Sequence, residues 1–192
     1  MSNNNIEIEV KFPLKNPDFV KTHLNSIAKL ISTDVFQRDT YYTPAHRNFL
    51  KVQYPFEWLR LRESDKGVSI NYKHFYPENI EITEYCDEYE SKIENVNTLQ
   101  QIFKSIDCRV LVVVEKVRTT WIYNSIEIVI DDVKALGSYI ELEATTSFKN
   151  PLDGKRFLYS VLKELKAEVG EEDYRGYPYR LLEKIGAPND RV

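Results

Sequence analysis

The stretch Glu7-Ile8-Glu9-Val10-Lys11 is the part of the sequence from which the fold is best inferred. Side chains of a β-strand point alternately to its two faces, so both carboxylates and the lysine share one face. Ile8 and Val10 lie on the other face, together with Ile6 and Phe12. A strand with one charged and one apolar face is typical of a sheet that covers a core on one side.

The same alternation recurs along the chain, with like charges paired on single segments. Arg60 and Arg62 alternate with leucines, and Glu141 and Glu143 flank Leu142. One reading is a solvated sheet face with cross-strand ion pairs. Recurrence on several strands favours the other reading, a shared charged site. Further members of these faces are Lys73, Glu88, Glu90, Lys116, Arg118, Glu127 and Asp131.

Length and composition limit the possible classes of protein. The chain has 192 residues, which suits a single domain over residues 1–192. Its formal net charge of −4 gives no general attraction to nucleic acid. The longest apolar run is much shorter than the ~20 residues of a membrane span, and no secretory signal is recognisable. We therefore expect a soluble, cytoplasmic protein, with Cys86 and Cys108 as reduced thiols.

Strand and helix signals alternate along the chain without a low-complexity linker. Asp65-Lys66-Gly67 predicts a hairpin turn, Asn97 a helix cap, and Asn16 and Asn150 caps that each precede a proline. The first helix is predicted to bury Phe19, Val20, Leu24, Ile27 and Leu30 on one face. Strands are predicted at 5–12, 34–42, 57–63, 69–75, 81–90, 109–123, 125–133 and 139–146, and helices from residues 16, 97, 150 and 177.

Eight mostly antiparallel strands with helices define an α+β fold and can close into a barrel. If the apolar faces of the strands pointed inward, the helices would have no apolar surface to cover. We therefore expect the charged faces inside a closed β-barrel and the helices packed outside. Trp58 and Trp121 are interpreted as packing residues.

A charged barrel interior has to contain water or a ligand, because burying an unpaired charge costs roughly several kcal/mol. A chain of phosphates with bound divalent cations matches both signs of charge. Basic side chains bind phosphate oxygens, and carboxylates bind hard cations through oxygen.

The charged segments resemble the CYTH superfamily, also called triphosphate tunnel metalloenzymes. Glu7, Glu9 and Lys11 resemble the E-x-E-x-K signature of that superfamily. The resemblance covers nearly the whole chain, in order. The further matching segments are Gln37-Arg38-Asp39-Thr40-Tyr41-Tyr42, Leu59-Arg60-Leu61-Arg62-Glu63, Asn71-Tyr72-Lys73, Glu88-Tyr89-Glu90, Glu115-Lys116-Val117-Arg118, Ser125 to Asp131 and Gly137 to Glu143.

The resemblance implies roles for individual residues. A substrate triphosphate is expected to bind Lys11, Arg60, Arg62, Lys73, Lys116 and Arg118, with Lys11, Lys73 and Arg118 as the catalytic members. Mg²⁺ or Mn²⁺ is the expected cofactor, with Glu7, Glu9, Asp131, Glu141 and Glu143 as the metal ligands. Glu127 is a possible further member of the acidic set, and Asp39 is open to a structural role beside a basic partner. The C-terminal Ser-Tyr of the family is absent, since Gly176-Tyr177-Pro178-Tyr179-Arg180 precedes the Leu-Leu pair.

The resemblance also implies an enzyme that acts on a triphosphate. The interpretation preferred is a class IV adenylyl cyclase, which converts ATP to 3′,5′-cyclic AMP and pyrophosphate. The alternatives are an inorganic or thiamine triphosphatase that releases orthophosphate, and a non-catalytic sensor of polyphosphate or nucleotide. The expected partner is a nucleoside triphosphate or polyphosphate, without nucleic acid or membrane, and a homodimer is possible by resemblance only.

Overall fold

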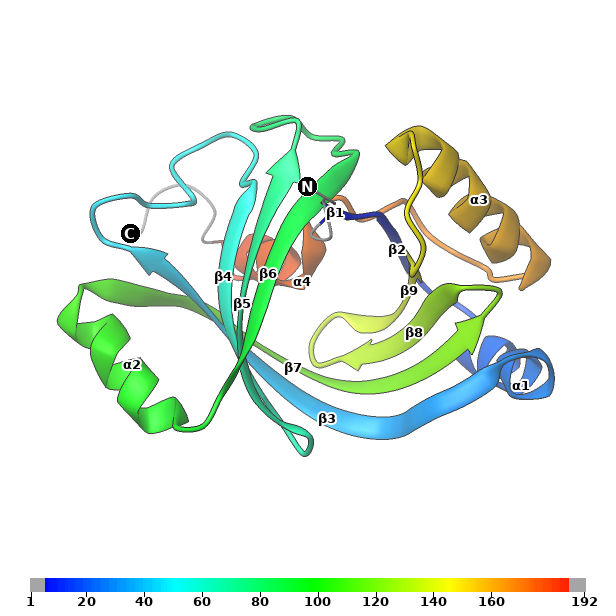
Figure 1. Cartoon of the computed structure of the whole chain (residues 1–192), viewed down its shortest axis with the longest axis horizontal. Helices are drawn as coiled ribbons and strands as arrows, with labels where there is room; N and C mark the ends of the chain where they lie inside the picture. The colour runs from blue at the N-terminus through cyan, green and yellow to red at the C-terminus, as the bar shows by residue number, and fades with distance from the viewer. Residues whose placement is uncertain (1–5, 187–192) are drawn as a thin grey trace. The chain divides into compact units, whose positions relative to one another are not determined.

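The computed structural model describes residues 6–186, with side chains from residue 8 onward. This part of the chain holds nine strands and four helices (Figure 1). The ninth strand, one more than expected, arises because Ile8 interrupts the first predicted strand. The strands are β1 Ile6–Glu7, β2 Glu9–Pro13, β3 Lys29–Pro44, β4 Glu57–Ser64, β5 Gly67–Tyr76, β6 Tyr85–Ile93, β7 Cys108–Tyr123, β8 Ile126–Val133 and β9 Gly137–Ala144. The helices are α1 Pro17–Ile27, α2 Val96–Ser105, α3 Pro151–Glu164 and α4 Gly176–Lys184.

The strands form one sheet in the order β1-β6-β5-β4-β3-β7-β8-β9-β2. The described registers of its strand pairs are antiparallel, which confirms the α+β class. Ser64 pairs with Gly67 at the predicted hairpin, so Asp65 and Lys66 form the turn. Gly67 has φ +121°, a backbone conformation that glycine adopts without strain. Closure of the sheet into a barrel stays a prediction.

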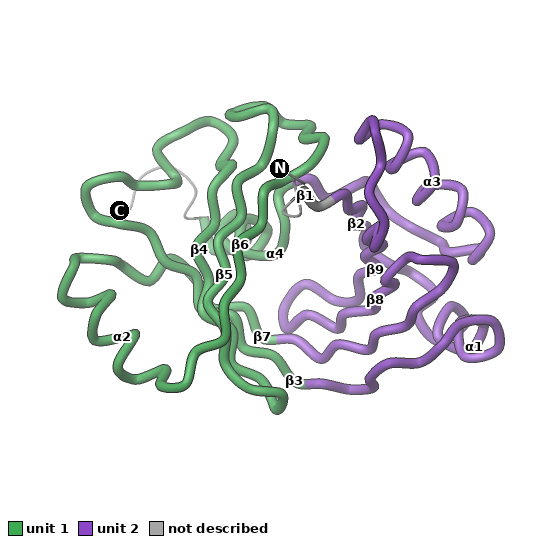
Figure 2. Tube along the Cα trace, in the orientation of Figure 1, with its two compact units in different colours: residues 1–6, 36–115, 175–192 green, residues 7–35, 116–174 purple. Residues whose placement is uncertain are grey.

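The chain divides into two compact units (Figure 2). Unit 1 contains residues 36–115 and 175–186 with residue 6, and unit 2 contains residues 7–35 and 116–174. The two long strands β3 and β7 each continue from one unit into the other. The prediction of a single domain remains a prediction.

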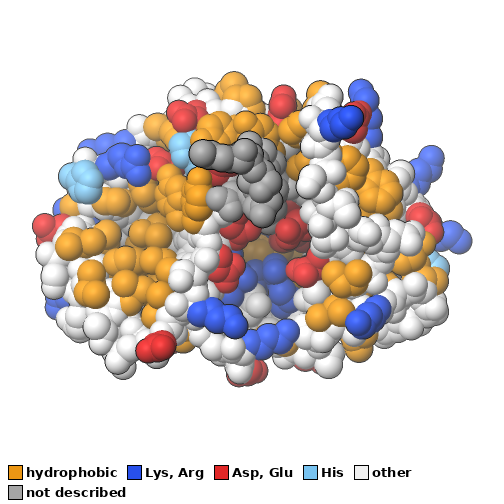
Figure 3. Space-filling view, viewed as in Figure 1, with side chains coloured by type: hydrophobic (Ala, Val, Ile, Leu, Met, Phe, Trp, Pro, Cys, Tyr) orange, Lys and Arg blue, Asp and Glu red, His pale blue; other side chains and the backbone are white. Residues whose placement is uncertain are grey.

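The core of unit 1 lies between the sheet and α2. Tyr42, Leu61 and Phe103 form a buried cluster, and the rings of Tyr42 and Phe103 meet edge to face at 4.9 Å. Leu61 alternates with Arg60 and Arg62 on β4, so the helix covers the apolar face of the strand. Hydrophobic side chains also gather on the exposed surface over α2, on the left of Figure 3.

The caps of α2 and α3 show where the sequence specifies helix ends. Asn95 caps α2, because its Oδ1 accepts a hydrogen bond from Thr98 N at 2.9 Å. The predicted cap, Asn97, instead lies inside the helix. Asn150 caps α3 as predicted and accepts from Leu152 N at 3.0 Å. The prediction for α2 was wrong by two residues because Asn can stand at a cap or in the first turn.

The core of unit 2 lies between the apolar faces of β2, β8 and β9 and the helices. Helix α3 packs against β2 and β9. A Cβ on Gly154 of α3 would lie 2.9 Å from Ile8 Cδ1, so the absence of a side chain at Gly154 lets α3 approach the Ile8 side chain closely. Together with the sheet residues Val10, Ile128 and Leu142, these contacts confirm that helices cover the apolar face in unit 2 as well.

Helix α1 buries less of its surface than predicted. Val20 and Leu24 are fully buried, whereas Phe19, Ile27 and Leu30 are exposed. Leu30 lies outside the helix because α1 ends at Ile27 and β3 begins at Lys29. Two buried side chains, one helical turn apart, attach this short helix to the sheet.

The segment that follows α3 runs along β2. The N–H groups of Gly170 and Asp173 donate to the carbonyls of Pro13 and Lys11 at 2.9 and 2.8 Å. Asn16 stands at the N-cap position of α1 as predicted, but its side chain makes no capping hydrogen bond. It reinforces the contact with β2 instead, since it donates to Lys166 O and accepts from Glu168 N. No helix within residues 6–186 is long and apolar enough to cross a membrane.

Candidate functional site

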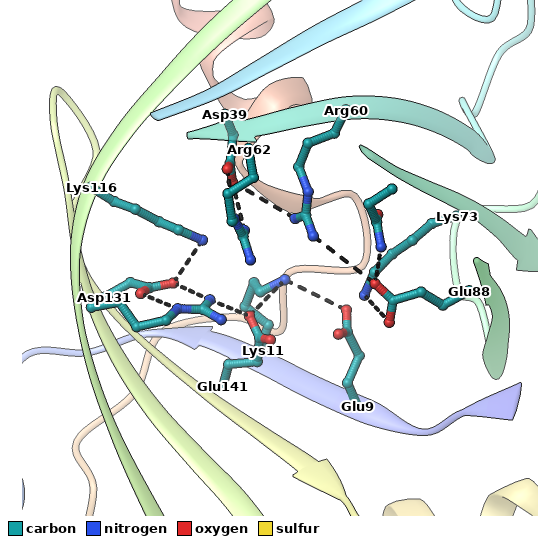
Figure 4. A network of polar contacts seen from close by, with 12 residues as sticks. Glu9, Lys11, Asp39, Arg60, Arg62, Lys73, Glu88, Lys116, Asp131 and Glu141 are labelled. Carbon is teal, nitrogen blue, oxygen red and sulfur yellow. Dashed lines mark hydrogen bonds and ion pairs between the residues drawn. The ribbon is translucent and has the colours of Figure 1, made fainter. Parts of the chain in front are cut away.

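The charged face of unit 1 carries what we call the Asp39 cluster: Asp39, Arg60, Arg62, Lys73 and Glu88. Asp39 on β3 stands directly opposite Arg62 on β4. Arg62 donates two hydrogen bonds to it, Nε to Oδ1 and Nη2 to Oδ2, both at 2.7 Å. Arg60 Nη1 lies 3.7 Å from Asp39 Oδ2 (Figure 4). Asp39 is therefore shared by two arginines of one strand.

Glu88 forms the second acidic centre of this cluster. It lies on β6, opposite Lys73 of β5, and its carboxylate is 3.7 Å from Lys73 Nζ and 4.0 Å from Arg60 Nη2. Asn71 also donates a hydrogen bond to Glu88. The side chain of Glu88 is 24% exposed, whereas that of Asp39 is fully buried. The two carboxylates therefore differ in their access to solvent and ligand.

Arg60 is the basic residue whose surroundings point most directly to an anion. Burial alone would lower the pKa of its guanidinium, but Asp39 and then Tyr41 raise it above the ordinary value, so the charge is permanent. Its buried Nε has no hydrogen-bond partner among the described residues. A buried donor without an acceptor costs roughly 1–3 kcal/mol, which a bound phosphate oxygen would recover.

The charged face of unit 2 carries the Asp131 cluster: Asp131, Lys116, Arg118, Lys11 and Glu141. Asp131 on β8 stands opposite Arg118 on β7. Arg118 donates from Nε to Oδ1 at 2.7 Å and from Nη2 to Oδ2 at 2.6 Å. Lys116 Nζ lies 3.3 Å from Oδ2. Glu141 is held by Lys11 at 3.1 Å and by Arg118 at 3.5 Å (Figure 4).

Asp131 is fully buried, and burial alone would raise the pKa of its carboxyl. The Arg118 guanidinium and then the Lys116 ammonium outweigh that effect and hold the pKa below its ordinary value. Asp131 is therefore ionised at neutral pH. A carboxylate in this position is the structural counter-charge of two cations.

Three glutamates form a row across neighbouring strands of unit 2. Glu9 of β2 faces Glu143 of β9, and Glu143 faces Glu127 of β8. Directly opposite like charges destabilise a sheet unless cations lie near them. Lys11 Nζ is 3.5 Å from Glu9. The row therefore places Glu127, which the resemblance leaves uncertain, directly opposite the predicted metal ligand Glu143 and on the same face as Glu9.

The chemistry of this row suits Mg²⁺ or Mn²⁺, since both prefer carboxylate oxygens. Within the described side chains, however, no three Asp, Glu, His or Cys residues lie close enough together to hold a metal ion. Glu7 is a strand residue of β1, but its side chain lies outside the described part of the structure. The metal set thus stays a prediction.

The structure places all six predicted phosphate ligands on the charged faces of the two units. Arg60, Arg62 and Lys73 lie together in unit 1. Lys11, Lys116 and Arg118 lie together in unit 2. Residue patterns alone did not identify Asn71, two positions before Lys73, as a partner of Glu88, because its uncharged side chain adds nothing to the pattern of alternating charges.

The sequence identifies the family. Residues 5–177 match the model of the CYTH domain, so the chain belongs to the CYTH family. A protein of Methanocaldococcus jannaschii, provisionally named an adenylate cyclase, is 31% identical over 162 residues. The match covers 84% of this chain and 89% of that protein.

Solved structures share the fold. A protein of Pyrococcus horikoshii superposes with a TM-score of 0.77 at 25% identity, over 93% of this chain and 99% of that one. A Hippeastrum protein, described as an adenylyl cyclase candidate with a dominant triphosphatase activity, superposes with a TM-score of 0.59 at 18% identity. The match covers 95% of this chain and 96% of the Hippeastrum chain. The family fold is thus associated with both cyclase and triphosphatase names.

Proposed function

We propose that the protein is a divalent-metal-dependent enzyme that acts on a triphosphate. The observation that carries this proposal is the charged face of each unit, where three basic side chains gather around buried or half-buried carboxylates. In unit 1 the unpartnered Nε of Arg60 adds a donor that suits a phosphate oxygen. Membership of the CYTH family supports the same substrate class.

The proposal assigns phosphate binding to the basic residues of both clusters. Among them, Lys11, Lys73 and Arg118 are proposed as catalytic, because each contacts a glutamate that is less deeply buried than Asp39 and Asp131 and that an incoming phosphate oxygen can replace. Positioning of the phosphates and neutralisation of their charge would supply most of the rate enhancement. The assigned phosphate ligands are Lys11, Arg60, Arg62, Lys73, Lys116 and Arg118.

Glu7, Glu9, Glu141 and Glu143 are proposed to hold Mg²⁺ or Mn²⁺. A bound divalent cation would neutralise phosphate charge and polarise the phosphoryl oxygens. Asp131 was expected in this set, but both of its oxygens already accept hydrogen bonds from Arg118. The register of Glu127 opposite Glu143 makes it the better further candidate.

The preferred reaction is that of an adenylyl cyclase. The 3′-hydroxyl oxygen of ATP attacks the α-phosphorus and loses its proton, and the bond from the α-phosphorus to the bridging oxygen breaks. The products are 3′,5′-cyclic AMP and pyrophosphate. The name of the 31% identical M. jannaschii protein supports this choice.

A triphosphatase is the second candidate, because the same cationic side chains serve either reaction. In it, water attacks a terminal phosphorus of tripolyphosphate, thiamine triphosphate or a nucleotide, and orthophosphate leaves. The activity described for the Hippeastrum protein of the same fold is the specific observation in its favour.

Product analysis distinguishes these reactions. Purified protein would be incubated with ATP, tripolyphosphate or thiamine triphosphate, each with Mg²⁺ or Mn²⁺, and the products separated by chromatography and identified by phosphorus NMR. An Arg60→Ala preparation purified in parallel is the control for contaminating phosphatases.

Cyclic AMP with equimolar pyrophosphate, lost in the Arg60→Ala protein, is the expected result. Orthophosphate formed faster from a non-nucleotide triphosphate would make the protein a triphosphatase. Binding without any product under either metal would reject an enzyme and leave a polyphosphate sensor.

A further inference from the structure

The Asp39 and Asp131 clusters repeat one arrangement on two different strand pairs. In each, a fully buried aspartate stands opposite an arginine of the neighbouring antiparallel strand. In each, a second basic residue precedes that arginine by two positions and also contacts the aspartate. The two arrangements are Asp39 with Arg62 and Arg60, and Asp131 with Arg118 and Lys116.

Each of the two aspartate–arginine pairs is joined by two hydrogen bonds, an arrangement that we call a fork. The two forks use the same atoms. Each arginine uses Nε and Nη2, and each aspartate uses one oxygen for each nitrogen, at distances between 2.6 and 2.7 Å. The Nη1 amino group takes no part in either fork. Because a guanidinium is planar, fixing one edge fixes the direction of the remaining donors.

These aspartates are more deeply buried than the glutamates on the same sheet faces. Both aspartates are 0% exposed, while the side chains of Glu88 and Glu141 are 24% and 10% exposed. A carboxylate with both oxygens in a buried fork is poorly available as a metal ligand. The glutamates are the members of each cluster that a ligand can reach.

We propose that Asp39 and Asp131 are positioning residues, which hold Arg62 and Arg118 so that Nη1 of each guanidinium faces a phosphate oxygen of the substrate. This inference rests on the proposed function, which supplies the phosphate. It gives Asp131 a role different from the metal ligand expected from the sequence. A guanidinium that is held in place before binding loses less conformational entropy when the phosphate arrives.

The sign of a charge change makes the inference testable. Asp131→Asn removes one negative charge, so charge alone would tighten the binding of a polyanion. Loss of the bidentate hydrogen bonds would weaken it instead, and we expect roughly 10-fold to 100-fold, by analogy with the hydrogen-bond partners of metal-ligating side chains. The two effects therefore have opposite directions.

The experiment is isothermal titration calorimetry of tripolyphosphate, with a chelator present so that no metal takes part. It compares the wild-type protein with Asp131→Asn, Asp39→Asn and Asp132→Asn. Asp132 is the matched control, because it is the next residue of β8, has the same charge and is exposed on the opposite face. We expect weaker binding in the first two variants and unchanged or tighter binding in the third.

A second readout follows the fork itself. In ¹⁵N-labelled protein, the Nε–H resonance of Arg118, identified by its absence in Arg118→Lys, should shift and exchange faster with water in Asp131→Asn. Arg118→Lys keeps both charges but removes the fork, so it should also bind tripolyphosphate more weakly. This variant tests the inference even if Asp131→Asn fails to fold.

The outcomes separate the two proposals. Wild-type protein that binds tripolyphosphate neither with the chelator nor with added Mg²⁺ would overturn the proposed function and with it the role of the aspartates in binding. Wild-type binding that is matched or exceeded by folded Asp131→Asn and by Arg118→Lys would overturn only the positioning role.

Discussion

Asp131 and Glu141 show that two acidic residues of one charged face can have different roles. Asp131 is fully buried and holds Arg118 through both oxygens. Glu141 retains some exposure and contacts Lys11 and Arg118 by single ion pairs. The alternation in the sequence predicts that both side chains share a face, but it does not give the register. Which carboxylate faces which cation follows only from the pairing of β7, β8 and β9.

The depressed pKa of Asp131 makes the stability of the protein pH-dependent. A carboxyl whose pKa in the folded state is below its ordinary value of 3.8 stabilises the native state, and this contribution is fully present above pH 3.8. The contribution is lost as the pH falls through the folded-state pKa. Asp131→Asn should therefore lower the free energy of unfolding by roughly 1.5–3 kcal/mol near neutral pH and by less in acid.

Urea unfolding of both proteins across the range from neutral to strongly acidic pH measures this difference. Asp132→Asn, with its exposed carboxylate, should remain close to the wild type at every pH. A difference between wild type and Asp131→Asn that stays constant into strong acid would show that the ionised carboxylate is not the source of the effect.

Glu9 tests the acidic row of unit 2. Glu9→Gln removes one anionic oxygen ligand without changing the size of the side chain, so metal-dependent activity should fall by at least about 100-fold. Mn²⁺ binding, followed by electron paramagnetic resonance, should weaken in parallel. Glu171→Gln, at an exposed position of the same unit, is the control. Normal Mn²⁺ affinity in Glu9→Gln would remove Glu9 from the metal site.

Helix α2 shows how far elements could be predicted from the sequence. Its existence follows from the spacing of Leu99 and Phe103, but its first residue does not, because Asn95 and Asn97 are chemically equivalent cap candidates. The choice depends on the backbone, which is extended at Asn95 and helical from Val96. Likewise, the burial of α1 depends on how much sheet lies beneath it, which periodicity does not reveal.

The cap of α2 provides a paired test. Asn95→Ala removes the hydrogen bond to Thr98 N and should lower the free energy of unfolding by about 1 kcal/mol. Asn97→Ala should leave it unchanged or raise it slightly, because alanine is the better helix former inside α2. Chemical denaturation of the two variants measures both effects, and equal destabilisation would contradict the cap assignment.

Two adjacent residues of α2 test which face of the helix is buried. Phe103 packs against Tyr42 and Leu61, so Phe103→Ala should cost roughly 3–5 kcal/mol of stability. Ile102 is 48% exposed, and Ile102→Ala should cost much less. Thermal unfolding by calorimetry compares them. Similar losses in both variants would mean that the exposed side of α2 is covered in solution.

At the scale of the whole molecule, β3 and β7 link the two compact units. Each is a continuous strand of 16 residues that crosses the boundary between them. Unfolding one unit would remove backbone partners from strands that continue into the other. The sequence predicts β7 at nearly its full length, as residues 109–123, but only residues 34–42 of β3. It carries no signal of the boundary between the units, since no linker composition marks it.

Continuity of these strands predicts cooperative unfolding. The two tryptophans report the units separately, because Trp58 lies in unit 1 and Trp121 in unit 2, and both are buried. In Trp58→Phe and Trp121→Phe, the denaturation curves from tryptophan fluorescence should each coincide with the curve from circular dichroism. Separate transitions would show that the units unfold independently.

The segment along β2 also has a consequence for the order of folding. The residues of strand β2 are synthesised early, yet its two edges pair with β9 and with the stretch from Glu168 to Asp173, which are synthesised late. Contacts so distant in sequence form late, because the intervening chain must first be ordered. A nascent chain that ends before Glu168 therefore leaves one edge of β2 open to pairing with another molecule. The strand that carries Glu9 and Lys11 is thus expected to complete its pairing late, and chains that end before Glu168 are expected to aggregate more readily than the full chain.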